Sequence, residues 1–188
     1  PLIHGSGKAG TSDIMTCEAC EFVDTFLKLY PDIAVVLNID ADHLDYFKTV
    51  DNIIKSFRKF CENATKAVIY NGDDANTRKA VEGIGGKDMI TFGRNSDNDY
   101  YPVNVCRVSG MKTTFTLMHK GEKVADMTIN VPGEHNVINA VAACASALYV
   151  GAEPSELPSA LESFHGAGRR FEKVGEKNGI TVVDDYAH

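Results

Sequence analysis

The sequence predicts an α/β fold: a mostly parallel, doubly wound sheet with flanking helices and a small antiparallel β ribbon. Three observations support this class. Short runs of β-branched residues alternate with segments whose apolar residues recur at helical spacing, which is typical of a parallel sheet covered by helices. Between residues 103 and 130, three strand-like runs follow one another with glycines at the turns. Of the 188 residues, 44% are hydrophobic, which is enough for a buried core.

The first half of the chain alternates predicted strands and helices. Ile14–Glu18 is interpreted as the end of a short strand, and the helix-like run Phe22–Leu29 follows it and ends before Pro31. The apolar run Ile33–Ile39 predicts a strand buried on both faces. We then expect a helix at Val50–Cys61, a strand at Ala67–Tyr70, a turn and helix cap at residues 71–74, a helix at Ala75–Glu82 and a strand at Met89–Phe92.

The second half begins with the antiparallel ribbon. Its expected strands are Val103–Val108, Thr113–Met118 and Lys123–Asn130, inserted in the main sheet or packed beside it. An alanine-rich helix at Val137–Tyr149 should end near Gly151. A second helix should cover Glu153–Phe164, and Ile180–Asp184 reads as a last strand.

Charge and composition exclude several classes of partner. The net charge of −7 gives the chain no general attraction for phosphate backbones, so we expect no nucleic acid partner. No apolar run is long enough to span a membrane, and no signal peptide is visible. The five cysteines are odd in number and widely scattered, which argues against a disulfide framework. We therefore expect a cytoplasmic protein.

Two segments suggest chemistry that their details do not support. The glycine-rich stretch at residues 5–12 does not match a phosphate-binding loop, because Lys8 is followed by Ala9, so we favour a flexible loop. Cys17 and Cys20 form a C-x-x-C, for which a redox or zinc role is the alternative. We favour two small buried thiols that flank a functional Glu18.

Acidic side chains follow two predicted strands. Glu18 and Glu21 lie near the end of one strand, and Asp40-Ala41-Asp42-His43-Leu44-Asp45 follows Ile33–Ile39 directly. The carboxyl ends of strands in an open α/β sheet form the ligand crevice, and carboxylate oxygens favour Mg²⁺. The imidazole is more usual for Mn²⁺. The alternative, equally weighted on spacing alone, is that these acids cap the following helices.

Three later motifs suit a nucleotide. Asn136 and Asn139 share a helix face and could match the edge of a purine, although N-capping by Asn136 is the simpler alternative. The pair Arg169-Arg170 in a glycine-rich loop suits phosphate, the alternative being a solvated surface pair. A carboxylate in Asp184-Asp185-Tyr186-Ala187-His188 could accept hydrogen bonds from a ribose.

In order along the chain, E-A-C-E, N-I-D-A-D-H-L-D-Y-F, G-E-H-N-V-I-N, R-R-F-E and D-D-Y-A-H resemble the Mur ligase family, from about residue 2 to residue 188. The resemblance implies that Glu18 and His43 bind Mg²⁺ and that Asp42 supports His43. It also implies a catalytic set of Arg170, His43 and Glu18. The residues it assigns to ATP are His135, Asn136, Asn139, Arg170 and Asp185.

The branch that the motifs resemble joins L-alanine to UDP-N-acetylmuramate through an acyl phosphate. The alternatives are a branch that adds a tripeptide to the same nucleotide sugar, and a non-catalytic nucleotide-binding domain. The resemblance implies that residues 1–184 form a truncated central ATPase domain without its phosphate-binding loop, and that residues 185–188 begin a linker to a C-terminal domain. Such a piece should not catalyse ligation alone, and its open sheet edge could pair with another copy.

Overall fold

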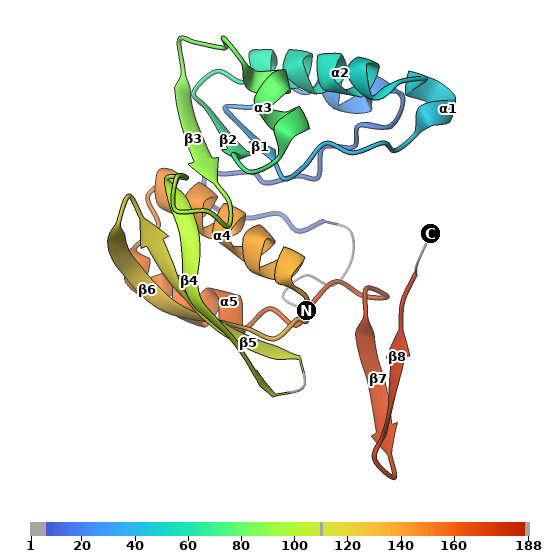
Figure 1. The fold of residues 1–188 in the computed structure, drawn as a ribbon, viewed down its shortest axis with the longest axis vertical. Coiled ribbons are helices and arrows are strands. Elements are labelled where there is room, and N and C mark those ends of the chain that lie inside the picture. Colours follow the sequence, from blue (N-terminus) through green and yellow to red (C-terminus); the bar gives the residue numbers. More distant parts are fainter. Residues whose placement is uncertain (1–6, 110, 187–188) are drawn as a thin grey trace.

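The computed structural model describes residues 7–109 and 111–186. Its main feature is a six-stranded mixed sheet (Figure 1), which confirms the predicted fold class. The strands, in both chain order and sheet order, are β1 (Ile33–Val36), β2 (Ala67–Asn71), β3 (Asp88–Phe92), β4 (Tyr100–Ser109), β5 (Lys112–His119) and β6 (Glu122–Ile129). Neighbours from β1 to β4 are parallel and those from β4 to β6 are antiparallel.

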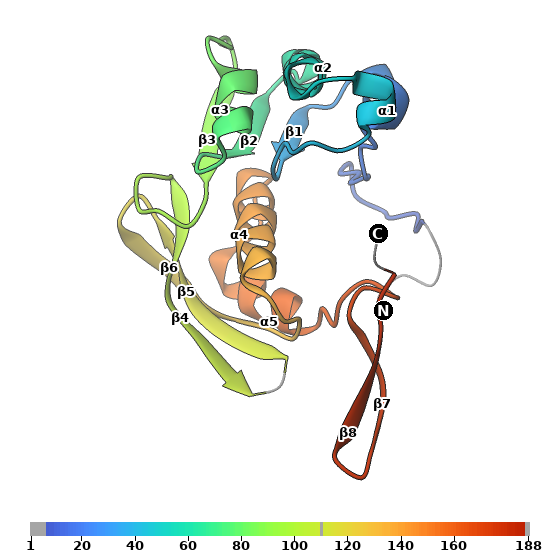
Figure 2. The ribbon, with the colours of Figure 1, turned by 45° about the vertical axis from the view of Figure 1, so that its right-hand side comes forward.

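Helices cover both faces of this sheet (Figure 2). One hydrophobic core joins β1–β3 to η1 (Phe22–Lys28), α1 (Leu44–Phe47), α2 (Val50–Asn63) and α3 (Ala75–Val81). The other joins β2–β6 to α4 (Glu134–Tyr149) and α5 (Leu157–Glu162), which follows the short η2 (Pro154–Glu156). Because successive side chains of a strand point to opposite faces, Val68 lies in the first core and Ile69 in the second.

The caps of the helices on the first face follow sequence signals. Thr49 precedes α2 and its hydroxyl oxygen accepts a hydrogen bond from Asn52 N at 3.3 Å. Asp74 precedes α3, and its carboxylate accepts from Thr77 N at 2.7 Å, which confirms the cap expected at residues 71–74. Each cap satisfies a backbone N–H that the helix leaves without a partner.

The antiparallel ribbon continues the main sheet instead of forming a separate layer. β3 and β4 pair in parallel only at Phe92 and Tyr100. Residues 93–99 connect them without a helix, although parallel neighbours usually need a longer crossover. Gly93 N donates to Tyr100 O at 3.1 Å and closes this short connection. The sheet therefore changes from parallel to antiparallel at β4.

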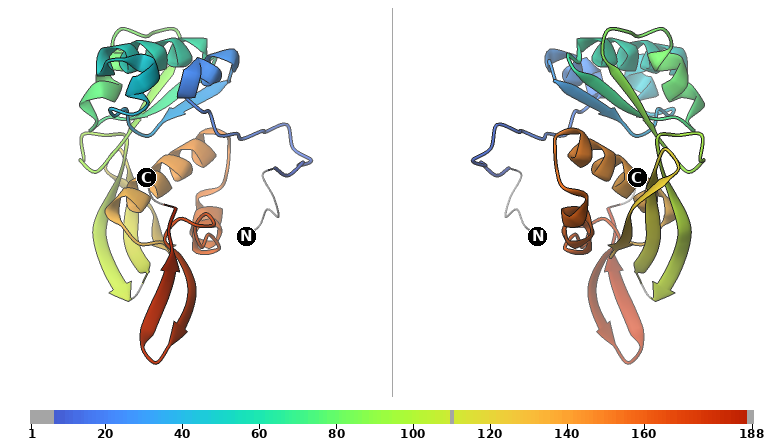
Figure 3. Two further views of the ribbon diagram at one scale, coloured as in Figure 1. Left: turned by 90° about the vertical axis from the view of Figure 1, so that its right-hand side faces the viewer. Right: turned by 90° about the vertical axis from the view of Figure 1, so that its left-hand side faces the viewer.

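A separate hairpin follows the second core. β7 (Glu172–Lys177) pairs with β8 (Ile180–Asp184) in a two-stranded antiparallel sheet that projects away from the rest of the chain (Figure 3). β8 lies where the last strand was predicted, whereas the sequence showed no sign of β7. Val174, Ile180 and Val182 are all more than half exposed. An alternating apolar pattern is weak when both faces of a hairpin lie open, so β7 was not recognisable.

Other expectations need correction. Residues 14–18 form no strand, and no strand pairs with the outer side of β1 in the described part of the chain. The run expected to be helical at Phe22–Leu29 is a 3₁₀ helix in which Val23 and Asp24 adopt left-handed backbone angles. β1 ends at Val36, before the predicted Ile39. None of the described helices is long and apolar enough to cross a membrane.

Candidate metal and nucleotide site

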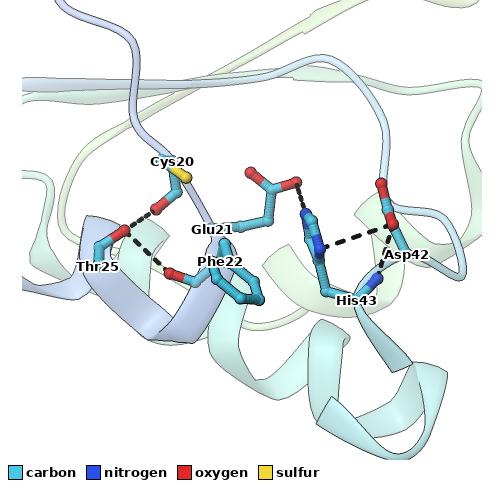
Figure 4. Close-up of polar contacts among 6 residues, drawn as sticks. All are labelled: Cys20, Glu21, Phe22, Thr25, Asp42 and His43. Atoms are coloured by element: carbon cyan, nitrogen blue, oxygen red, sulfur yellow. Dashed lines mark hydrogen bonds and ion pairs between the residues drawn. The ribbon is translucent and has the colours of Figure 1, made fainter. Parts of the chain in front are cut away.

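Glu21, Asp42 and His43 form a cluster beyond the carboxyl end of β1. One ligand atom of each residue lies within 4.8 Å of the others. His43 Nε2 is 3.7 Å from Glu21 Oε1, and His43 Nδ1 is 3.8 Å from Asp42 Oδ1. Figure 4 shows the two carboxylates on opposite sides of the imidazole. We call these three residues the acidic–imidazole cluster.

The turn that presents Asp42 and His43 is folded largely by its own acids. Asp40 Oδ1 accepts a hydrogen bond from Ala41 N, and Asp42 Oδ1 accepts one from His43 N, both at 2.7 Å. His43 has left-handed backbone angles (φ 51°, ψ 38°) and caps α1. Short side chains of Asp compete well for nearby backbone N–H groups, which favours turns. Asp42 therefore has the supporting contact expected of it.

The start of this turn is tied to α3. Ile39 is only 2% exposed, so its backbone groups need protein partners. Ile39 N donates to Asp74 Oδ1 at 3.4 Å, and Asn76 Nδ2 donates to Ile39 O at 2.9 Å. Because α3 follows β2 directly, these bonds join the carboxyl ends of two neighbouring strands.

The donor set of the cluster fits a divalent cation. Mg²⁺ holds its ligands at ~2.1 Å in an octahedron, so ligand atoms on opposite sides are about 4.2 Å apart. The three ligand atoms lie within 4.8 Å of one another, a bound slightly wider than that span. About two-thirds of the His43 and Glu21 side-chain surface is covered, since each is 34% exposed, and Asp42 is 76% exposed. An open side remains for water or a phosphate oxygen, as Mg²⁺ sites usually require.

The structure does not bring Glu18 into this cluster. Glu18 is exposed, in the extended segment before η1, and its role as a metal ligand stays a prediction. Glu21, three positions later, lies beside His43 instead.

Cys17 and Cys20 are both exposed, so the interpretation of two buried thiols is wrong. Those thiols are accessible because the segment that carries them does not pack as a strand.

The buried thiols lie elsewhere in the chain. Cys61 is in α2 and Cys144 is in α4. Burial raises the pKa of each thiol to about 12, so both are inert neutral groups at physiological pH. Neither contributes to a candidate site.

The second part of the site is the start of α4. Gly133 caps the helix at φ 100°, a backbone conformation that L side chains rarely adopt, so a glycine is favoured there. Asn136 Nδ2 donates to Pro132 O at 2.6 Å. The alternative that Asn136 is an ordinary N-cap is therefore wrong. His135 and Asn139 are exposed and accessible to a ligand.

Asp73, which the sequence did not single out, organises the connection beside α4. Its carboxylate accepts hydrogen bonds from Asn95 Nδ2 and Asn98 Nδ2, each at 2.9 Å, and from the backbone N–H groups of residues 94 and 95. Partial burial raises the pKa of Asp73, but these hydrogen bonds outweigh it and hold the pKa below its usual value. Arg94 Nη2 then reaches Glu134 Oε2 at 2.6 Å. The connection is thus attached to the start of α4.

Arg170 and Asp185 both lie near the base of the β7–β8 hairpin. Arg170 N donates to Ala167 O at 3.2 Å, and the Arg170 side chain is exposed. Tyr186 N donates to Arg169 O at 2.7 Å, and the Arg169 guanidinium lies 4.9 Å from the centre of the Tyr186 ring. Asp185 is therefore held close to the arginine pair. Among the described residues, no hydrogen bond or ion pair joins Arg169 or Arg170 to the acidic–imidazole cluster or to α4.

Comparisons with known proteins agree on one family. The family model "Mur ligase middle domain" matches residues 8–147. The UDP-N-acetylmuramate–L-alanine ligase of Agathobacter rectalis is 40% identical over 188 residues, which are 99% of this chain and 41% of that protein. The chain therefore spans about two-fifths of the length of such relatives.

Solved structures of Mur ligases share the fold. MurC, the UDP-N-acetylmuramate–alanine ligase of Thermotoga maritima, has a TM-score of 0.74 and 27% identity over 88% of this chain and 37% of its own. The MurF ligase of the same organism, solved with ADP, has a TM-score of 0.68 and 21% identity over 86% of this chain and 37% of its own, and it shows the shared fold. Because the family model covers most of the chain, the protein belongs to the Mur ligase family, and its matched residues form a middle domain of that family.

Proposed function

We propose that the chain is the ATP-binding middle part of a ligase that joins L-alanine to UDP-N-acetylmuramate. The observation that carries this proposal is the 40% identity, over nearly the whole chain, to relatives that bear the name of that activity. The acidic–imidazole cluster supports it, because such a ligase must handle phosphate groups beside a cation. The boundary we propose lies at residue 184, with residues 185–188 in a linker to a C-terminal domain.

The proposed reaction has two steps. A carboxylate oxygen of UDP-N-acetylmuramate attacks the γ-phosphorus of ATP, the bond to ADP breaks, and an acyl phosphate forms. The amine of L-alanine then attacks the acyl carbon, loses a proton and expels phosphate. The first step brings two anions together, so it needs fixed positive charge at the point of contact.

The chain has residues suited to bind the cation and to contact the γ-phosphate. His43, with Glu21 and Asp42, would hold Mg²⁺, and Glu18 remains the predicted further carboxylate. A divalent cation supplies positive charge that offsets the repulsion between carboxylate and phosphate. Arg170 would add a guanidinium that can make two parallel hydrogen bonds to the γ-phosphate.

The nucleoside would be bound by other segments. His135, Asn136 and Asn139 at the start of α4 would contact adenine, and Asp185 would accept hydrogen bonds from the ribose. The Asn136 side chain already donates one hydrogen bond to Pro132 O, which orients the amide. The second N–H and the oxygen of that amide would then hydrogen-bond to the purine edge.

The test is L-alanine-dependent phosphate release by the full-length protein with UDP-N-acetylmuramate and ATP. We expect release with L-alanine and none when L-alanine is omitted. Activity with a tripeptide in place of L-alanine would assign the protein to the tripeptide-adding branch. ATP binding without turnover on any acceptor would leave only a nucleotide-binding role and reject the proposed ligase.

A further inference from the structure

We propose that Asp24 is a positioning residue that holds the two halves of the acidic–imidazole cluster at the separation a divalent cation requires. Glu21 comes from the start of η1, whereas Asp42 and His43 come from the turn before α1. Nothing in the local sequence keeps these two segments together. The inference rests on the proposed function, because it concerns the proposed Mg²⁺ site.

Both carboxylate oxygens of Asp24 are used to join η1 to the neighbouring helices. Asp24 Oδ2 accepts a hydrogen bond from the Tyr46 hydroxyl at 2.8 Å, and Asp24 Oδ1 accepts one from the Ser56 hydroxyl. Tyr46 lies three positions after His43 in α1, and Ser56 lies in α2. Asp24 itself is three positions after Glu21. One side chain thus connects the Glu21 segment to the helix that begins at His43.

The backbone at this point is strained. Val23 has φ 54° and ψ 33°, and Asp24 has φ 56° and ψ 24°. These left-handed angles are costly for a β-branched residue such as valine and persist only where the surroundings enforce them. Asp24 N donates to Glu21 O at 2.9 Å and closes the turn that starts at Glu21. The carboxylate of Asp24 therefore maintains a turn that the chain would not adopt alone.

The burial of Ser56 and the ring contacts of Phe22 strengthen this link. Ser56 is only 6% exposed, so its hydroxyl would be left buried without this partner if Asp24 were lost. The Phe22 ring lies 4.8 Å from the His43 ring and 6.5 Å from the Tyr46 ring, measured between centroids. Figure 4 shows Phe22 beside His43, next to Glu21. The segment 21–24 is thus packed and hydrogen-bonded against α1.

A cation site gains affinity when its ligands are held in place before the ion binds. Residues that orient metal ligands typically change metal affinity by about 10- to 100-fold when they are replaced. Asp24 acts on the segment that carries Glu21 and not on a ligand atom, so we expect an effect of about tenfold.

The experiment uses the full-length protein and titrates Mn²⁺ alone, with free Mn²⁺ followed by electron paramagnetic resonance. Asp24→Asn and Tyr46→Phe should each weaken Mn²⁺ binding, Asp24→Asn by about tenfold. Tyr46→Phe removes a single hydroxyl from a side chain that is 39% exposed, so folding should survive it. The matched control is Tyr30→Phe, which removes the same group from a side chain that is 80% exposed and should bind Mn²⁺ as the wild type does.

A second measurement separates positioning from a general loss of folded protein. In the ligation assay, both variants should require more Mg²⁺ for half-maximal rate while the KM for L-alanine stays unchanged. Fewer folded molecules would lower kcat without moving the Mg²⁺ requirement. Melting temperatures of all variants check the same point.

The outcomes distinguish the positioning role of Asp24 from the proposed ligase function. His43→Ala is the reference for loss of a ligand. If His43→Ala weakens Mn²⁺ binding while Asp24→Asn and Tyr46→Phe bind as the wild type does, Asp24 has no positioning role. If His43→Ala also binds as the wild type does, the cluster is not a cation site, and the positioning role is overturned with it. A wild type that ligates no substrate rejects the proposed ligase, whatever the Mn²⁺ titrations show.

Discussion

Single residues of the candidate site differ in how they are held. The backbone of His43 is held by the neighbouring Asp42, so its local conformation follows from adjacent residues. Glu21 reaches His43 from a segment about twenty positions away, and its place depends on contacts made by Asp24. Asn139 is exposed on the first turns of α4, so its amide is accessible to a ligand.

Asn139 provides a test of the nucleotide-binding residues. In the full-length ligase, Asn139→Ala should raise the KM for ATP by about two- to thirteenfold, because one hydrogen bond to a bound ligand contributes about 0.5–1.5 kcal/mol. Steady-state kinetics with varied ATP would measure this change. The KM for L-alanine in the same variant serves as the control and should not move. An unchanged KM for ATP would remove Asn139 from the adenine site.

Among the elements, α3 has the clearest structural task. Its N-cap, Asp74, satisfies both the backbone N–H and the hydroxyl of Thr77, a residue that is 0% exposed. The same carboxylate accepts from Ile39 N, at the start of the turn that leads to His43. α3 therefore does more than cover β2, because its first residues also position the chain that leaves β1.

Replacing Asp74 should weaken the fold measurably. Asp74→Ala removes the cap and leaves the Thr77 hydroxyl buried, so we expect the free energy of unfolding to fall by about 2 kcal/mol. Urea unfolding of the 188-residue chain, followed by circular dichroism, measures it. Asp97→Ala is the matched control, since Asp97 is an exposed aspartate and its loss should cost under about 0.5 kcal/mol. Equal midpoints for the two variants would contradict the capping role.

The whole molecule consists of one continuous sheet with two cores and a projecting hairpin. β1 is the terminal strand of the sheet, and Val35 and Leu37 beside this edge are 39% and 41% exposed. An open strand edge with exposed apolar side chains is a template for pairing with another chain. The sequence suggested that an open sheet edge could pair with another copy, and we propose that any such pairing uses β1.

Sedimentation velocity over a range of protein concentrations tests that association. Val35→Lys places a charge on the open edge and should shift the population toward monomer. Val150→Lys is the control, because Val150 is 40% exposed and lies outside the strands, so it should leave the distribution unchanged. A wild-type chain that stays monomeric at every concentration would refute pairing through β1.

Most elements of the core around β1–β3 could be predicted from the sequence. The helical spacing of Val50, Ile53, Ile54, Phe57 and Phe60 predicted α2 nearly to its ends, and the β-branched run at Ile33 predicted β1. Local periodicity predicts these elements, because the face to which a side chain points depends only on its position within the helix or strand. Within the turn that holds Asp42 and His43, the side-chain hydrogen bonds of the two aspartates also join adjacent residues. The bonds that tie the start of this turn to α3 and its cap span 35 and 37 positions and required the folded chain.

Other features required the folded chain. Glu21, not Glu18, lies beside His43 because Asp24 binds Tyr46 and Ser56, which are 22 and 32 positions away. The left-handed angles at Val23 run against the local preference of valine, so no pattern in the sequence could indicate them. Local sequence thus specified which residue types could bind a cation and a nucleotide. Packing between distant segments selected the carboxylate that reaches the imidazole, because only long-range contacts can offset a locally unfavourable backbone.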